Sequence, residues 1–392
     1  MLAICGGEVF APWERFSPGL VVIEQEKISY VGPWEKGRVP AGARILEAEG
    51  KLVAPGLVDV HIHGCAGADF LRDGRAGLEK MARFLARRGV TSFLPTTPSA
   101  PLEELESAIE AAREAASKPA VGARVLGLHL EGPYISPSQK GAHRPDYLRK
   151  PDIQECARLV EMGRDMVMML TLAPELEGAL NFIRWLREQG VVVSLGHSNA
   201  TYRETKAAIE AGANHACHLF NCMPDLNKRE PGIVGALLED ERVYTELIAD
   251  LTHTHPMILQ MATAMKGPRR TVLISDAMEA TGMPDGSYAL AGLKVLMKSG
   301  VARLEDGTLA GSTLTLGQAV KNVVEVLGIP VEEALGMASQ NAADSLGPDS
   351  GRRQAPAQRG RLAVGAEGDA VIFNPDFSAA ATVVGGEVVF RS

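Results

Sequence analysis

The stretch "GLVDVHIHGC", residues 56–65, places two histidines one residue apart inside an apolar run. In a β-strand, side chains at i, i+2 and i+4 point to one face, so Asp59, His61 and His63 share one side of the strand. Three polar groups on one face of a buried strand require partners. A metal ion or a hydrogen-bonded core would each supply them, and this stretch by itself leaves both possibilities open.

The composition of the whole chain limits the class of protein. Its 392 residues are 46% hydrophobic and 22% charged, with a net charge of −8, which argues against a nucleic-acid-binding protein because such proteins need a basic surface. The five cysteines are odd in number and irregularly spaced. The first residues lack a basic segment, and we find no apolar run of about 18 residues, so we expect neither a signal peptide nor a membrane span. These features together predict a protein of the reducing cytoplasm.

Both ends of the chain are predicted to form strands. Residues 19–32, "GLVVIEQEKISYVG", suggest two short strands around a turn, and Gly385-Gly386 between valine-rich runs is typical of a hairpin. Neither terminal segment is long enough to build a sandwich alone. We therefore predict that residues 1–54 and 355–392 pair into one small β-sandwich domain.

Between the two ends, a pattern of helix, glycine and valine-rich strand recurs. An expected helix around residues 77–88, for example, precedes Gly89 and the strand "VTSFLPTT", residues 90–97. Alternating strands and helices predict an α/β fold with a parallel sheet. The length of residues 55–354 favours a closed (β/α)8 TIM-type barrel, in which the carboxyl ends of the strands carry the active site.

Polar residues follow the apolar runs at five of the expected strand ends. They are His61 and His63, His129 and Glu131, His197, His218, and Asp276. If the barrel closes, all of these side chains face one mouth. Imidazoles and carboxylates suit Zn²⁺ and other first-row divalent ions, so the pattern favours a metal site over a purely structural polar network.

The motifs along the chain resemble the amidohydrolase superfamily of metal-dependent barrels and, within it, the family of N-acetylglucosamine-6-phosphate deacetylases. The resemblance rests on "HIHGC", "LPTT", "GLHLEGPY", "KGAH", "TLAPE", "GHSNA", "HLFN", "REPG", "ISDA" and "AGSTLT", which follow the family's order across nearly the whole chain. It implies metal-dependent hydrolysis of the acetamide of N-acetyl-D-glucosamine 6-phosphate to glucosamine 6-phosphate and acetate, in amino-sugar catabolism or recycling.

The resemblance also implies the ligands of the metal. Glu131, His197 and His218 match the ligands of a principal ion. His61 and His63 match positions that hold a second ion in some members of the family and are replaced by non-ligands in others. We therefore expect one or two divalent ions per subunit, with Zn²⁺ first and Fe, Mn or Co as alternatives.

The resemblance assigns the remaining site residues to catalysis and substrate binding. Asp276 matches the catalytic acid/base, and His143 matches a residue that touches the acetyl carbonyl of the substrate. The expected substrate contacts are His143, Asn221, Cys222, Arg229, His253 and Leu309. Arg229 and His253 match phosphate contacts that come from the neighbouring subunit in the family, which implies a homodimer; the roles of His129 and His255 stay open.

Two other functions compete with this hypothesis. Another amidohydrolase, such as a dihydroorotase or an N-acyl-amino-acid deacylase, would share the barrel and the metal ligands but would not need the phosphate-contacting segments "HLFNC" and "REPG". A non-catalytic barrel used as a scaffold is an alternative of another class. Such a scaffold has no need of the ligands, yet every candidate ligand and Asp276 are present in this chain.

Overall fold

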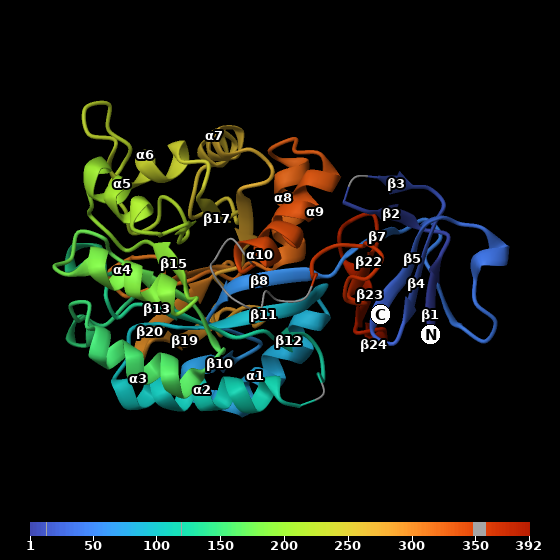
Figure 1. The fold of residues 1–392 in the computed structure, drawn as a ribbon, viewed down its shortest axis with the longest axis horizontal. Helices are drawn as coiled ribbons and strands as arrows, with labels where there is room; N and C mark the ends of the chain where they lie inside the picture. Colours follow the sequence, from blue (N-terminus) through green and yellow to red (C-terminus); the bar gives the residue numbers. More distant parts are fainter. Residues whose placement is uncertain (13, 119, 348–357) are drawn as a thin grey trace.

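Strands from the two ends of the chain form two sheets that lie beside a larger part built from the middle of the chain (Figure 1). The computed structural model describes residues 1–12, 14–118, 120–347 and 358–392. One sheet has the order β5-β4-β1-β6 and consists of β1 (Leu2–Cys5), β4 (Gly19–Glu24), β5 (Lys27–Pro33) and β6 (Arg44–Glu47). The other has the order β24-β23-β22-β7-β2-β3 and consists of β2 (Glu8–Phe10), β3 (Arg15–Phe16), β7 (Leu52–Pro55), β22 (Ala370–Phe373), β23 (Ala379–Val384) and β24 (Glu387–Arg391).

These two sheets share one hydrophobic core. Ile4 and Ile23 from the first sheet pack in the same buried cluster as Val53, Ile372 and Val383 from the second. Strand β7 pairs with β2 from the N-terminal segment and with β22 from the C-terminal segment, so segments far apart in sequence become neighbours. The prediction that the two termini build sheets together is confirmed, and both ends of the chain lie in this part (Figure 1).

The middle of the chain forms a nearly closed parallel barrel. Its sheet runs from β8 through β11 to β18, and every pair of neighbouring strands is parallel. The two edges meet through a parallel bridge between Ile62 and Ala277, where the Asp276 N–H donates to the His61 carbonyl at 2.9 Å. The barrel strands within the described ranges are β8 (Leu57–Ile62), β11 (Val90–Thr97), β13 (Leu128–Glu131), β14 (Val167–Leu172), β15 (Val192–Leu195), β16 (His215–Ala216), β17 (Tyr244–Ile248) and β18 (Thr271–Ile274).

Helices cover the outside of the barrel. α4 shows the reason, because Phe182, Ile183 and Leu186 on one face are buried while its charged residues stay outside. A capping box forms at the start of α5, where the side chains of Thr201 and Glu204 each bond the other's backbone. The helices are α1 (Phe70–Ala86), α2 (Leu102–Ala116), α3 (Ile153–Gly163), α4 (Ala179–Glu188), α5 (Tyr202–Glu210), α6 (Gly232–Glu239), α7 (Pro256–Lys266), α8 (Leu316–Glu325), α9 (Val331–Met337) and α10 (Gln340–Ser345).

A small antiparallel sheet between β18 and α8 was not expected from the sequence. It is formed by β19 (Gly286–Leu290), β20 (Leu293–Lys298) and β21 (Val301–Arg303), and Leu290, Val295 and Met297 pack in a core of their own. The remaining short elements are β9 (Gly64–Cys65), β10 (Ala68–Asp69), β12 (Arg124–Val125) and the 3₁₀ turns at Lys36–Arg38, Pro137–Gln139 and Pro145–Tyr147.

The observed fold class matches the predicted one, a (β/α)8 barrel with sheets built from both termini. The chain passes from the second sheet into the barrel at Gly56, between the end of β7 and the start of β8. The predicted boundary between residues 354 and 355 lies outside the described residues. Among the described helices, none combines the length and the apolar character that crossing a bilayer requires.

Candidate active site

Candidate ligands from five barrel strands meet at the carboxyl rim of the barrel. They are His61 and His63 at the end of β8, Glu131 at the end of β13, and His197, His218 and Asp276 two residues after β15, β16 and β18. All six side chains are buried. Because parallel strands of a barrel end at one rim, residues separated by more than 200 positions in sequence lie in one cluster.

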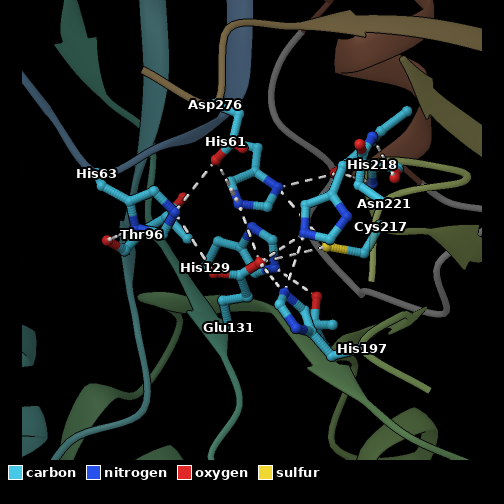
Figure 2. A network of polar contacts seen from close by, with 12 residues as sticks. His61, His63, Thr96, His129, Glu131, His197, Cys217, His218, Asn221 and Asp276 are labelled. Atoms are coloured by element: carbon cyan, nitrogen blue, oxygen red, sulfur yellow. Dashed lines mark hydrogen bonds and ion pairs between the residues drawn. The ribbon is translucent and has the colours of Figure 1, made fainter. Parts of the chain in front are cut away.

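Glu131 lies at the centre of this cluster. Its Oε1 is 2.9 Å from His218 Nε2 and 3.0 Å from His197 Nε2, and these two nitrogens are 3.1 Å apart. Its Oε2 is 3.4 Å from His63 Nε2, which in turn is 3.3 Å from Asp276 Oδ1. Figure 2 shows these side chains pointing toward one another around the Glu131 carboxylate.

In two histidines, the hydrogen-bond partner of Nδ1 determines whether Nε2, the atom that faces the cluster, carries a hydrogen. His197 Nδ1 is 2.8 Å from the Gln139 carbonyl, and His63 Nδ1 is 3.2 Å from the Thr96 carbonyl. A carbonyl oxygen only accepts hydrogen bonds, so each Nδ1 carries the hydrogen. In the neutral rings, each Nε2 therefore presents a lone pair to the cluster.

His61 follows the same rule with a different partner. Its Nδ1 is 3.0 Å from the Glu246 carboxylate, while its Nε2 is buried and has no hydrogen-bond partner among the described residues. The nearest acceptors to this Nε2 are Glu131 Oε1 and Asp276 Oδ1, each at 3.5 Å. The cluster thus directs lone pairs at carboxylate oxygens, an arrangement that only a cation, either a proton or a metal ion, stabilises.

The donor set fits a divalent metal ion. Two ligands bound about 2.0–2.1 Å from a tetrahedral Zn²⁺ lie roughly 3.3 Å apart. The nearest nitrogen and oxygen atoms of Glu131, His197 and His218 are 2.9–3.1 Å apart. Imidazole nitrogen and carboxylate oxygen are also the ligand types that first-row divalent ions prefer.

The two central carboxylates are ionised. Burial raises the pKa of Glu131, but His61, His197 and the hydrogen bonds from His143 and His197 outweigh it and hold this pKa well below its usual range. Burial also raises the pKa of Asp276, and the His63 contact and the charge of His61 lower it below its usual value. Positive charge beside them, either a proton on an imidazole or a metal ion, therefore stabilises both carboxylates in their ionised form.

His143 presents the same ring nitrogen, Nε2, to the pocket, but with the hydrogen on it. Its Nδ1 accepts the Ser99 backbone N–H at 3.0 Å, so the hydrogen of the neutral ring is on Nε2, which lies 3.3 Å from Glu131 Oε2. Burial lowers the pKa of His143 to about 4, against the hydrogen bond to Glu131 that raises it. At neutral pH this ring is therefore a hydrogen-bond donor in the pocket, in contrast to the lone pairs of His61, His63 and His197.

Three of the candidate residues occupy strained backbone positions. His197, His218 and Asp276 have φ values of 48°, 23° and 48°, in the left-handed region that non-glycine residues rarely adopt. The turn at Asp276 is held on both sides, because its N–H donates to the His61 carbonyl and its own carbonyl accepts the Ser312 N–H. Such positions cost about 1–3 kcal/mol each and are concentrated at functional sites.

The cluster forms the floor of a cavity of about 350 Å³. Ten of the twelve residues predicted for the site line it, namely His63, Glu131, His143, His197, His218, Asn221, Cys222, His253, Asp276 and Leu309. The other lining residues, which the sequence did not suggest, are Pro98, Ala142, Leu290, Arg303, Thr308 and Gly311. The small sheet β19–β21 contributes Leu290 and Arg303, so it forms part of the cavity wall.

Two predicted residues lie outside the cavity lining. His61 is fully buried beside the lining residues, and Arg229 is exposed on the loop before α6. His253, which the resemblance placed in a neighbouring subunit's site, lines the cavity of its own chain and pairs through Nδ1 with Asp250 at 2.7 Å.

Sequence reasoning missed Glu246. Its carboxylate is fully buried on β17, where it contacts His61, His215 and the backbone N–H of His218. The signal was a lone acidic residue inside the strand "YTELI", because a charged residue is almost never fully buried without a partner. The ring of His129, by contrast, bonds the Val60 carbonyl and Thr171.

A (β/α)8 barrel with this donor set at its carboxyl rim is the architecture of a metal-dependent barrel enzyme. A family model described as the amidohydrolase family matches residues 52–389. The N-acetylgalactosamine-6-phosphate deacetylase of Escherichia coli O157:H7 is 45% identical over 310 residues, which is 79% of this chain and 82% of the relative. The N-acetylglucosamine-6-phosphate deacetylase of Bacillus subtilis (strain 168) is 34% identical over 382 residues, 97% of this chain and 94% of the relative.

A solved structure agrees with these sequence relatives. A mutant N-acetyl-D-glucosamine-6-phosphate deacetylase from Mycobacterium smegmatis, in complex with N-acetyl-D-glucosamine 6-phosphate, superposes with a TM-score of 0.91 at 36% identity and covers 100% of this chain and 99% of its own. The chain belongs to the amidohydrolase family and, within it, to the group that its N-acetylglucosamine-6-phosphate deacetylase relatives define.

Proposed function

We propose that this chain hydrolyses the acetamide of N-acetyl-D-glucosamine 6-phosphate, giving glucosamine 6-phosphate and acetate in amino-sugar catabolism or recycling. One observation carries the proposal: a single cavity combines lone-pair imidazoles and carboxylates on its floor with the His143 donor on its wall. Amide hydrolysis needs both a cation position and a hydrogen-bond donor for the carbonyl oxygen. The relatives at 34–45% identity, whose names specify deacetylation of amino-sugar 6-phosphates, support the choice of substrate.

Glu131, His197 and His218 would hold the principal metal ion, and His61 and His63 with Asp276 offer a second position. When bound, a divalent ion supplies Lewis acidity and lowers the pKa of water from 15.7 to about 7. Zn²⁺ is our first expectation for this donor set, and Fe, Mn or Co fit it as well. Elemental analysis of the purified protein measures both the identity and the number of ions.

The chain's own residues then move the proton and stabilise charge. Asp276 accepts a proton from the attacking water as the water oxygen bonds to the acetyl carbon. His143 Nε2–H donates to the acetyl oxygen, where negative charge develops, a contribution of about 3–4 kcal/mol for one such donor. Asp276 returns its proton to the sugar nitrogen as the C–N bond breaks, so the products are acetate and the free amine.

The phosphate is expected at the side of the cavity formed by Asn221, Cys222 and His253, with Leu309 contacting the sugar. His253 is held by Asp250, whose carboxylate lies 2.7 Å from its Nδ1, and its ring lines the cavity. Cys222 replaces a small alanine common in the family, and its backbone N–H is not altered by that change. Arg229 is exposed and does not line this cavity. Because the resemblance implies that its phosphate contact is made in the neighbouring subunit, we propose a homodimer.

The 45% identity to an N-acetylgalactosamine-6-phosphate deacetylase makes the C4 epimer a second candidate substrate. A deacetylase assay should therefore compare three sugars: N-acetylglucosamine 6-phosphate, its C4 epimer N-acetylgalactosamine 6-phosphate, and unphosphorylated N-acetylglucosamine. We expect the phosphorylated sugars to react at least 100-fold faster in kcat/KM than the unphosphorylated one, since a hydrogen bond to a charged group contributes about 1.5–3 kcal/mol and the resemblance implies several such contacts with the phosphate. Equal rates with and without phosphate would favour a dihydroorotase-like enzyme or an N-acyl-amino-acid deacylase, and absence of bound metal together with absence of turnover would favour a scaffold.

We also propose that residues 1–54 and 355–392 form one domain and residues 55–354 the catalytic barrel. The shared core of the two terminal sheets supports this division. A barrel fragment expressed without the terminal segments should expose the surface of β11 and of the end of α1 that packs against β22 and β23, and should therefore aggregate. The full chain should stay soluble and unfold in a single transition. The cytoplasmic location expected from the sequence stays a prediction.

A further inference from the structure

We infer that Glu246 is a positioning residue for the metal centre, which orients His61 as a ligand and fixes the turn that carries His218. The inference rests on the proposed metal centre and goes beyond it by naming a residue that does not touch the ion. Glu246 Oε2 faces His61 Nδ1 at 3.0 Å and accepts the His218 backbone N–H at 3.0 Å. One buried carboxylate thus joins candidate ligands from β8 and β16, which are separated by 157 positions in sequence.

The contact with His61 sets the atom that faces the ion. A carboxylate only accepts hydrogen bonds when it is ionised, so His61 Nδ1 carries the hydrogen and Nε2 keeps its lone pair. A hydrogen-bonded carboxylate also makes the imidazole a more basic ligand than a neutral carbonyl does. His63 and His197 are held by the Thr96 and Gln139 carbonyls, so among these three candidate ligands His61 alone receives this charged support.

The contact with His218 acts on the backbone. His218 has a φ of 23°, and this turn is held at two successive residues by Glu246. The side chain accepts the His218 N–H, and the Glu246 carbonyl accepts the Leu219 N–H at 3.0 Å. The Glu246 side chain provides one of the two hydrogen bonds that fix this turn. Removing the side chain should therefore make the orientations of both the His218 ring and the His61 ring less well defined.

A purely structural role explains these contacts less well. Glu246 also contacts His215 Nε2 at 3.0 Å, so its three hydrogen-bond partners do resemble a satisfied core network. Burying a carboxylate costs several kcal/mol, however, and barrel interiors are ordinarily filled by branched apolar side chains. The network ends on two buried ring nitrogens without a hydrogen-bond partner among the described residues, His215 Nδ1 and His61 Nε2. Of the two, His61 Nε2 lies 3.5 Å from both Glu131 Oε1 and Asp276 Oδ1, at the place where an ion would lie. This position, and not the missing partner alone, favours a metal-positioning role.

The test compares metal binding by the wild-type protein and three variants. Glu246→Gln keeps a side-chain acceptor and removes the charge, and Glu246→Ala removes both. His215→Gln is the matched control, because His215 contacts Glu246 but neither ligand ring. Each protein is stripped with a chelator and titrated with Zn²⁺ against a chromophoric competitor, and the visible spectrum of the Co²⁺-loaded form reports the coordination geometry.

We expect Glu246→Gln to weaken Zn²⁺ binding about 10-fold and Glu246→Ala up to 100-fold, with altered Co²⁺ bands, while His215→Gln stays within 3-fold of wild type. Should Glu246→Ala fail to fold, Glu246→Gln decides the question. Wild-type affinity and spectrum in Glu246→Gln, or equal losses in Glu246→Gln and His215→Gln, would overturn the inference while leaving the proposed function intact. A wild-type protein that binds neither Zn²⁺ nor Co²⁺ would overturn the metal centre and this inference together.

Discussion

The chain contains two His-x-His segments that look alike in sequence and lie in different surroundings. His61 and His63 are on a barrel strand and direct their Nε2 lone pairs into one cluster. His253 and His255 lie in the loop between β17 and α7, where His253 pairs with Asp250 and His255 caps the helix. Each segment also contains a histidine whose Nδ1 contacts a carboxylate, Glu246 for His61 and Asp250 for His253.

What separates the two segments is the backbone and the neighbours. A strand repeats every two residues, so both rings of the first segment face one side, whereas a loop gives no such alignment. The first segment also has Glu131 and Asp276 within 3.5 Å. Among the described groups whose ligand atoms approach one another closely enough to hold an ion, none includes His253 or His255. The His-x-His spacing thus identifies candidate metal ligands, but only the candidates that lie beside ligand atoms from other segments of the chain can form a metal site.

The largest effect should come from the acid/base group beside the first segment. We expect Asp276→Asn to lower kcat by about 10²–10⁴ because the amide cannot take the proton from water. Single-turnover and steady-state assays would measure this, with metal analysis of the same sample as the control. Retained metal with turnover within tenfold of wild type would remove Asp276 from its proposed role.

The next largest effect should separate the two segments directly. His61→Ala or His63→Ala should weaken metal binding by about 10–100-fold and lower the number of ions per subunit, because each removes a lone pair aimed at the cluster. His253→Ala and His255→Ala should keep the wild-type metal content. Elemental analysis of all four variants after equal dialysis tests the contrast, and metal loss in the second pair would show that the two segments do share a function.

A smaller effect should reveal what His253 does. We expect His253→Gln to raise KM for the 6-phosphate sugar about 10–100-fold, because it removes a ring hydrogen bond to the charged phosphate of about 1.5–3 kcal/mol, with little change in kcat. The unphosphorylated sugar provides the control, since its kcat/KM should not change. An equal loss on both sugars would place His253 in the chemistry instead of in phosphate recognition.

Much of the site could be predicted from the sequence because each residue marks the end of an apolar strand. Glu131, His197, His218 and Asp276 are such residues, and a parallel barrel brings all strand ends to one rim. Their positions at strand ends were therefore enough to predict that they meet at one rim of the barrel, and the family motifs suggested the role of each residue. The fold class followed from the same alternation of helix, glycine and strand.

The supporting partners could not be predicted in this way. The Thr96 and Gln139 carbonyls, the Ser99 amide and the Glu246 carboxylate act through hydrogen bonds between distant segments. A backbone carbonyl has no sequence signature, and Glu246 differs from a surface acid only by its apolar neighbours. The sheet β19–β21 was not predicted either, because it is an insertion between β18 and α8 that the alternation of barrel strands and helices does not require.

The smallest predicted effect concerns His255. Its Nδ1 accepts the Met257 N–H at 3.2 Å at the start of α7, so His255→Ala leaves that N–H without its cap and should cost about 0.5–2 kcal/mol of stability. His255→Asn should recover most of the loss, because asparagine is a good N-cap residue. Denaturant unfolding of the three proteins measures the difference, with deacetylase activity expected to stay at the wild-type level in each. If His255→Ala instead changed kcat or metal content while His255→Asn did not restore it, the second segment would have a role at the site that its position at a helix end does not explain.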